Sequence, residues 1–123
     1  MYKATVVNSS RELTARDRIK FTDTENAIKL DEATANGKHL IISPVDYVEL
    51  HIECDKSDKG EYPLFLVIDK NGDKYVTGSE NFYNTFRDIF DNMKADGEEF
   101  ELDIYARESK NYKGKFFITC SLV

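Results

Sequence analysis

An alternation of apolar and polar residues along several short segments constrains the fold more than any other feature of this chain. The clearest case is VELHIEC at positions 48–54, where every second residue is apolar. Because successive side chains of a β-strand point to opposite faces, a period of two predicts a strand with one buried and one hydrated face. The same period recurs at 99–107 and 115–123, so we expect a mainly β fold that ends in a pair of strands.

Segments rich in β-branched and aromatic residues predict further strands. They lie at 2–7, 18–22, 39–54 (with a bend, an edge or a bulge at Pro44), 64–68 and 74–77. The residues RELTAR between the first two fit either a strand or a helical turn. Between the last two, Asn71 and Gly72 are expected to supply the positive φ angles of a tight hairpin turn.

One amphipathic helix is expected at about 79–94. Its apolar residues recur at spacings of three and four along one stripe, and they are Phe82, Phe86, Ile89, Phe90 and Met93. Either Thr77 or Ser79 can cap the N-terminus, and Thr77 with Glu80 matches the capping-box pattern. Gly97 is expected to end the helical region. We interpret the apolar stripe as the face with which the helix lies on the core of a sheet.

Length and element order together favour a single OB-like domain over residues 1–123. The chain has 123 residues and no linker-like stretch rich in Pro, Gly or Ser. Five or more short strands, with one amphipathic helix before the last two, correspond to an OB-like small barrel. A two-layer α+β sheet is the alternative.

The expected location is the cytoplasm, without membrane association. The N-terminal residues lack the apolar run of a secretory signal, and no stretch approaches the ~18 apolar residues of a membrane span. Cys54 and Cys120 lie in separate strand-like segments without metal-ligand spacing. We therefore expect two small core residues rather than a disulfide or a zinc site.

The sequence contains none of the motifs that commonly carry catalysis or hold a cofactor. There is no Gly-rich phosphate-binding loop, no nucleophile elbow and no zinc-protease helix. His39 and His51 have no evident ligand or nucleophile partner, and His51 alternates with acidic residues, as a solvated histidine does. We therefore expect a protein that works by binding, with no cofactor, no metal and no enzymatic activity.

Charge is distributed unevenly along the chain. The net charge is −6, which by itself is unfavourable for binding nucleic acid. Residues 106–116 nevertheless carry four cations and one carboxylate, so this strip is +3 and the remainder is −9. An acidic body with one basic strip fits a protein that contacts phosphates on one face, and it equally fits an acidic protein-binding module.

The basic strip lies in the predicted terminal hairpin, where aromatic residues accompany the cations. If the last two strands pair, their non-core residues share one face of the sheet. This candidate set consists of Tyr105, Arg107, Lys113, Lys115 and Phe117, with Lys110 and Tyr112 at the tip of the loop. Flat rings mixed with cations are what a groove for unstacked bases requires. The alternative is a solvated hairpin whose rings cover apolar surface.

Over most of its length the chain resembles the small single-stranded DNA-binding proteins of tailed phages that have an OB-type fold. The resemblance is carried by YKATVV, RIKF, FLVIDKNGDKYVTGSENFYNTFRDIFDNM and SKNYKGKFFITCSLV in that order, above all by the KGK-aromatic start of the last strand. It implies non-sequence-specific binding that protects displaced strands during replication or recombination of a phage or mobile element. The chain departs from this group in its acidic body, and we do not expect the acidic, Pro/Gly-rich tail that bacterial relatives use to recruit partners, which puts tail-mediated recruitment in doubt.

The resemblance also implies roles for individual residues. Stacking on bases is expected of Tyr105, Tyr112 and Phe117, and contact with phosphates is expected of Arg107, Lys110, Lys113 and Lys115. Tyr47, Tyr62 and His51, from neighbouring strands, are second-rank candidates. Host or replication proteins stay open as further partners, and so does an oligomer.

A rival hypothesis belongs to a different class of protein. An acidic surface also suits a phage or mobile-element protein that binds and inhibits a host protein, for instance by mimicking DNA. A small-molecule enzyme would need a deep pocket with convergent polar groups, which a sequence pattern does not reveal.

Overall fold

The computed structural model describes residues 2–55 and 60–123. The chain divides into two compact units, each built from two separate segments: Met1–Ile28 with Val45–Gly78, and Lys29–Pro44 with Ser79–Val123. The chain therefore passes from one unit to the other three times. Whether both units form the single domain expected from the sequence stays a prediction.

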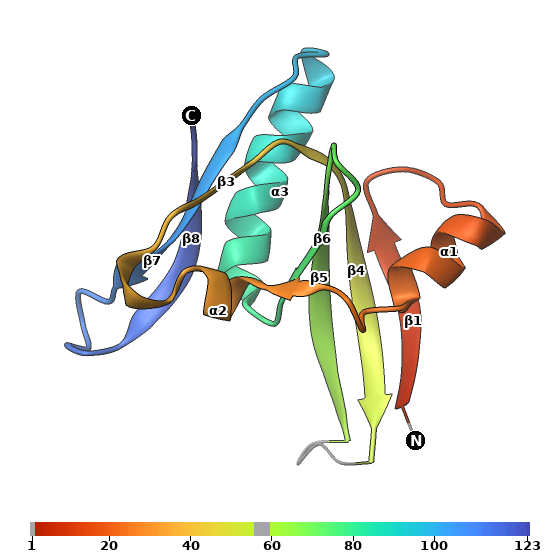
Figure 1. Ribbon diagram of the computed structural model, residues 1–123, viewed down its shortest axis with the longest axis horizontal. Coiled ribbons are helices and arrows are strands. Elements are labelled where there is room, and N and C mark those ends of the chain that lie inside the picture. The colour runs from red at the N-terminus through yellow and green to blue at the C-terminus, as the bar shows by residue number, and fades with distance from the viewer. Residues whose placement is uncertain (1, 56–59) are drawn as a thin grey trace. The chain divides into compact units, whose positions relative to one another are not determined.

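A five-stranded sheet forms most of the first unit (Figure 1). Its strand order is β1-β4-β5-β6-β2, and β1 and β4 are antiparallel, as are β5 and β6. The elements are β1 (Tyr2–Ser9), α1 (Ala15–Thr22), β2 (Ile28–Lys29), β4 (Pro44–Cys54), β5 (Glu61–Asp69) and β6 (Lys74–Thr77).

The core of this sheet confirms the period of two along 48–54. Val48, Leu50 and Ile52 are fully buried, whereas the residues between them are half-buried or exposed. They pack with Phe21 of α1 and with Leu66, Ile68 and Val76 of the neighbouring strands. Burial of this apolar surface is the main favourable term that holds the sheet together.

The strand expected at 18–22 is wrong, because these residues belong to helix α1. Thr14 caps this helix: its hydroxyl accepts from the Asp17 amide and the Asp17 carboxylate accepts from the Thr14 amide, each at 3.1 Å. Such a capping box satisfies two otherwise free amides and favours the helix over a strand. Consistent with a helix, Phe21 is buried whereas Ile19 is 73% exposed, although both would face one side of a strand.

The tight turn between β5 and β6 is present, but only one of its two residues adopts the expected positive φ. Gly72 has φ of 87°, and Asn71 does not adopt a positive φ. Instead, the Asn71 amide donates to the Asp69 carboxylate at 2.8 Å, which fixes the turn locally. The strand expected at 74–77 coincides with β6.

The second unit contains a three-stranded sheet with the order β3-β7-β8 (Figure 1). Its elements are α2 (Leu30–Ala33), the short 3₁₀ helix η1 (Ala35–Gly37), β3 (Leu40–Ile42), α3 (Glu80–Ala95), β7 (Leu102–Glu108) and β8 (Phe116–Leu122). Helix α3 packs against β8. The strand-rich segment expected at 39–54 thus contributes to both sheets, because β4 begins at Pro44.

The expected helix at 79–94 is confirmed as α3. Its N-cap is Ser79, whose hydroxyl accepts from the Phe82 amide at 3.2 Å, whereas Thr77 belongs to β6 and the expected Thr77–Glu80 capping box is wrong. The helix buries Phe82, Phe86 and Phe90 of the predicted stripe, together with Tyr83, while Ile89 and Met93 are half-buried. Gly97, with φ of 70°, follows its C-terminus as expected.

The expectation of a mainly β fold is confirmed, but no closed barrel is found among the described residues. The described strands number eight and form two sheets. Both cysteines are free thiols; Cys120 is buried, which raises its pKa to about 12, and Cys54 is half-buried. None of the described helices has the length and apolar character to cross a membrane.

Candidate nucleic-acid interface

The three-stranded sheet has a buried face and an accessible face. Its strands direct Leu102, Ile104, Ile118 and Cys120 into the core, where each is buried. The alternate residues are exposed or half-buried, and we call this side the outer face; its members are His39, Ile41, Asp103, Tyr105, Arg107, Phe117, Thr119 and Ser121.

Strand register brings three of the predicted site residues together on the outer face. In the β7–β8 pair, Arg107 lies opposite Phe117, and Tyr105 lies opposite Thr119. Residues directly opposite one another in an antiparallel pair point to the same side, so Tyr105, Arg107 and Phe117 share this face. Tyr105 is half-buried and Phe117 is 36% exposed, so neither ring is enclosed in the core.

Sequence reasoning missed His39, which contacts the predicted site directly. The His39 and Tyr105 rings are stacked, with centroids 5.0 Å apart and an angle of 23° between planes. His39 Nδ1 lies 2.9 Å from a carboxylate oxygen of Asp103, and the Tyr105 hydroxyl lies 2.9 Å from that of Ser121. These contacts hold the Tyr105 ring in place. The alternating pattern of β7 indicates which residues share its outer face, but it does not reveal that β3 pairs with β7.

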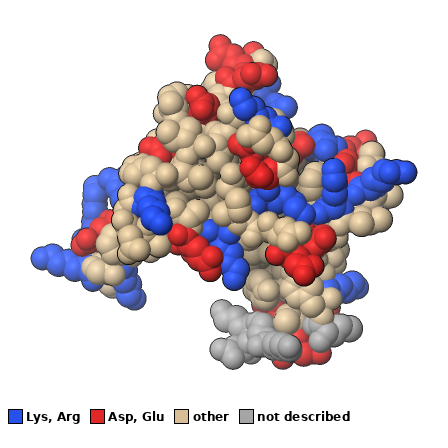
Figure 2. All heavy atoms as spheres, in the orientation of Figure 1, with Lys and Arg blue, Asp and Glu red and all other residues tan. Residues whose placement is uncertain are grey.

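The loop between β7 and β8 presents the lysines. Lys110, Tyr112, Lys113 and Lys115 are all exposed there. The Ser109 amide donates to the Lys115 carbonyl at 2.8 Å, and the Lys115 amide donates to the Tyr112 carbonyl at 3.2 Å. The Lys115 ammonium lies 5.4 Å from the centroid of the Tyr112 ring. Figure 2 shows the resulting group of Lys and Arg side chains at the tip of this hairpin, at the lower left.

The second-rank candidates belong to the first unit, whereas the hairpin belongs to the second. Tyr47 is only 6% exposed, so its ring is not available to stack on a base at the surface. Tyr62 is 36% exposed, and partial burial raises the pKa of its hydroxyl. His51 is half-buried and its Nε2 lies 3.3 Å from a carboxylate oxygen of Glu61.

A second group of cations lies on α1, outside the basic strip of residues 106–116. Arg16, Arg18 and Lys20 are exposed there around the side chain of Ile19. Arg11, which precedes the helix, is bound to the carboxylates of Asp17 and Asp46 at 2.8 and 3.1 Å. The exposed apolar side chain of α1 is aliphatic, so this surface offers charge without a ring for stacking.

Comparison with known proteins finds no matching family model, no matching curated protein and no matching solved structure. The function of the outer face therefore has to be inferred from its own chemistry.

Proposed function

We propose that this protein binds single-stranded DNA through the outer face of the β3-β7-β8 sheet and the adjoining β7–β8 loop. One observation carries the proposal. Tyr105, Arg107 and Phe117 share an accessible sheet face, and that face continues into a loop with three exposed lysines.

The two kinds of side chain have different roles. Tyr105, Tyr112 and Phe117 offer ring faces to unstacked bases, and each stacked base contributes roughly 1–3 kcal/mol to binding. The cations Arg107, Lys110, Lys113 and Lys115 contact phosphates, which carry no sequence information. His39 supports binding indirectly by holding the ring of Tyr105. Binding is therefore non-sequence-specific.

The biological role that we propose is protection of displaced strands during replication or recombination of a phage or mobile element in the cytoplasm. It is supported by the resemblance of the chain to phage single-stranded DNA-binding proteins. Proteins of that group have OB-type folds. We therefore include an OB-like fold of this chain in the proposal. The binding mechanism itself needs only the β7–β8 hairpin and the ring of His39.

The test is a fluorescence anisotropy titration of labelled oligo(dT), repeated at rising salt, with a parallel titration of oligo(U). We expect saturable binding of oligo(dT) that weakens steeply as salt rises, because phosphate contacts release counterions. Absence of binding at low salt would contradict the proposal. If the protein instead co-purified with a host protein and ignored both oligonucleotides, the inhibitor hypothesis would replace it.

A further inference from the structure

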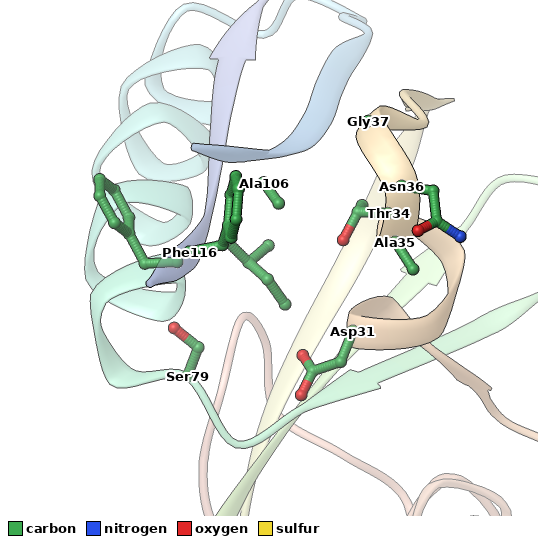
Figure 3. A pocket seen from close by; sticks show the side chains of 10 residues that line it. Asp31, Thr34, Ala35, Asn36, Gly37, Ser79, Ala106 and Phe116 are labelled. Carbon is green, nitrogen blue, oxygen red and sulfur yellow. The ribbon is translucent and has the colours of Figure 1, made fainter. Parts of the chain in front are cut away.

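A groove of about 680 Å³ opens in the second unit beside the start of β8 (Figure 3). Residues of α2, η1 and the connecting segment line one side, and residues of β7 and β8 line the other. The lining residues all belong to the second unit and are Asp31, Thr34, Ala35, Asn36, Gly37, Ser79, Ala106, Phe116, Phe117 and Ile118.

Its β8 side includes Phe116 and Phe117, which are neighbours in the strand and therefore direct their rings to opposite faces of the sheet. Phe116 is 64% exposed and Phe117 is 36% exposed. Exposure of the Phe116 ring leaves apolar surface hydrated, which a planar ligand in the groove would cover. The volume also falls within the range of roughly 300–1,000 Å³ that is usual for small-molecule sites. The groove is therefore large enough for a nucleobase.

The opposite side is polar and locally fixed. The Thr34 hydroxyl donates to the Leu30 carbonyl at 2.8 Å, and the Lys38 amide donates to the Ala35 carbonyl at 3.3 Å. Between them Asn36 adopts a left-handed conformation with φ of 60°. The small side chain of Ala35 and the absence of one at Gly37 keep this side open.

We infer that the groove receives one unstacked base of the single strand that the outer face binds. This inference rests on the proposed function. Phe117 of the outer face also borders the groove, whereas Ala106, Phe116 and Ile118 line it from the opposite side of the sheet, so the two surfaces adjoin at the end of the sheet where β8 begins. Lys115 immediately precedes Phe116, so a phosphate next to an inserted base would lie near an exposed ammonium.

The polar groups explain why a base, rather than a phosphate, would enter. The Asp31 carboxylate repels phosphate, but it accepts hydrogen bonds from N–H groups, which every base carries. A carboxylate has about four acceptor positions, so it can bind a ligand in addition to a protein partner. This carboxylate favours a hydrogen-bonding ligand without selecting one particular base.

The experiment is an abasic scan of an oligo(dT) about 12 nucleotides long, a length within the range that one single-strand-binding domain spans. Each position in turn lacks its base, and the dissociation constant is measured by competition anisotropy. With the native protein we expect removal of a base to weaken binding about 5- to 150-fold, both at the groove position and at the positions that stack on the outer face.

Two variants identify the groove position. Ala35→Leu fills the groove from an exposed site, and Phe116→Ala removes one wall; either should abolish the loss at the groove position and leave the other losses in place. Ala95→Leu, at the exposed C-terminal end of α3, is the matched control and should retain the native scan.

The outcomes separate the two proposals. If intact oligo(dT) binds, but the scans of the native protein and the Ala35→Leu variant coincide, the groove inference is overturned and the proposed function stands. If a free nucleoside binds the groove while intact oligo(dT) does not bind the protein, the groove serves a small ligand and both proposals fall. Failure of oligo(dT) and nucleoside alike also overturns both.

Discussion

At the scale of single residues, Tyr105 shows how a ring on an open sheet face is kept in one orientation. His39, which precedes β3, stacks on it, and Ser121 of β8 contacts its hydroxyl. A ring that is already ordered loses little conformational entropy when a base stacks on it. Under the proposed function, this ring of the outer face is ordered before a base arrives.

Replacing Tyr105 with alanine should weaken oligo(dT) binding by about 1–3 kcal/mol, the usual contribution of one stacked base. Tyr105→Phe keeps the ring and should bind nearly as the native protein does. Tyr2→Ala, which removes an exposed ring from the first unit, is the matched control. Anisotropy titrations of the three variants make the comparison, and equal binding by Tyr105→Ala would show that this ring does not touch the strand.

The loop lysines should determine the response to salt. Each phosphate contact with a single strand contributes about 0.7 to the slope of log affinity against log salt. The double variant Lys113→Ala/Lys115→Ala should therefore lower the magnitude of the slope by about 1.4. Lys3→Ala/Lys70→Ala removes the same charge from exposed sites in the first unit, and it should keep the native slope. If Lys113→Ala/Lys115→Ala showed the same salt slope as the native protein, these two lysines would not contact the DNA.

At the scale of elements, α3 depends on its row of phenylalanines. Phe86 is fully buried and its ring lies 5.7 Å from that of Phe82 and 5.6 Å from that of Phe90. Phe86→Ala should lower the free energy of unfolding by roughly 3–5 kcal/mol, because it leaves a cavity as well as losing apolar burial. Urea denaturation measures the change. Thr85→Ala, on the exposed side of the same helix, should stay within about 0.5 kcal/mol of the native value.

The capping box of α1 should make part of the stability depend on acid. A hydrogen bond from Arg11, and then one from the Thr14 amide, lower the pKa of Asp17 from 3.8 to about 2. Because the folded-state pKa is depressed, the stabilisation is complete above pH 4 and is lost as the pH falls toward 2. The difference in melting temperature between the native protein and Asp17→Asn should therefore shrink over that window. The Arg11→Gln variant should lose the same acid-dependent part of its stability. If the difference in melting temperature between the native protein and Asp17→Asn stayed constant over this window, the lowered pKa of Asp17 would be contradicted.

The sequence predicted correctly those elements in which apolar residues recur at one regular spacing along the segment. The strand at 48–54 and helix α3 both have a long, regular apolar spacing, and both were predicted. The failure at 18–22 has a local cause, since Ile19 and Phe21 imitate a strand while Thr14 and Asp17 form the capping box. An amphipathic pattern of four residues is too short to distinguish the period of a strand from that of an α-helix.

In the candidate site, too, residues placed by a local pattern were predicted, whereas residues placed by long-range pairing were not. Alternation within β7 and β8 was enough to place Tyr105, Arg107 and Phe117 on one face. His39 required the pairing of β3 with β7, which joins residues about sixty positions apart and leaves no local pattern. The groove depends on η1, whose left-handed Asn36 is equally hard to recognise from the sequence.

At the scale of the whole molecule, the distribution of charge bears on which nucleic acid the protein would select under the proposed function. The hairpin strip is +3, whereas the remaining residues sum to −9. Positive charge is therefore concentrated in the hairpin, and the net negative charge of the remaining residues is unfavourable for binding a duplex by charge alone. A single strand is flexible and exposes the ring faces of its bases, whereas in a duplex these faces are already stacked on each other.

Duplex DNA should therefore compete poorly with oligo(dT). Loss of the stacking contribution of even two bases, at roughly 1–3 kcal/mol each, corresponds to a discrimination of at least about 30-fold. The measurement is competition anisotropy at physiological salt, with unlabelled single strand and the matching duplex as competitors at equal nucleotide concentration. Tyr105→Ala/Phe117→Ala should reduce the discrimination, since its source is stacking, whereas Lys113→Ala/Lys115→Ala should weaken binding of both forms and largely preserve their ratio. Equal competition by the duplex against the native protein would mean that phosphate contacts alone hold the DNA and that the rings of the outer face serve another purpose.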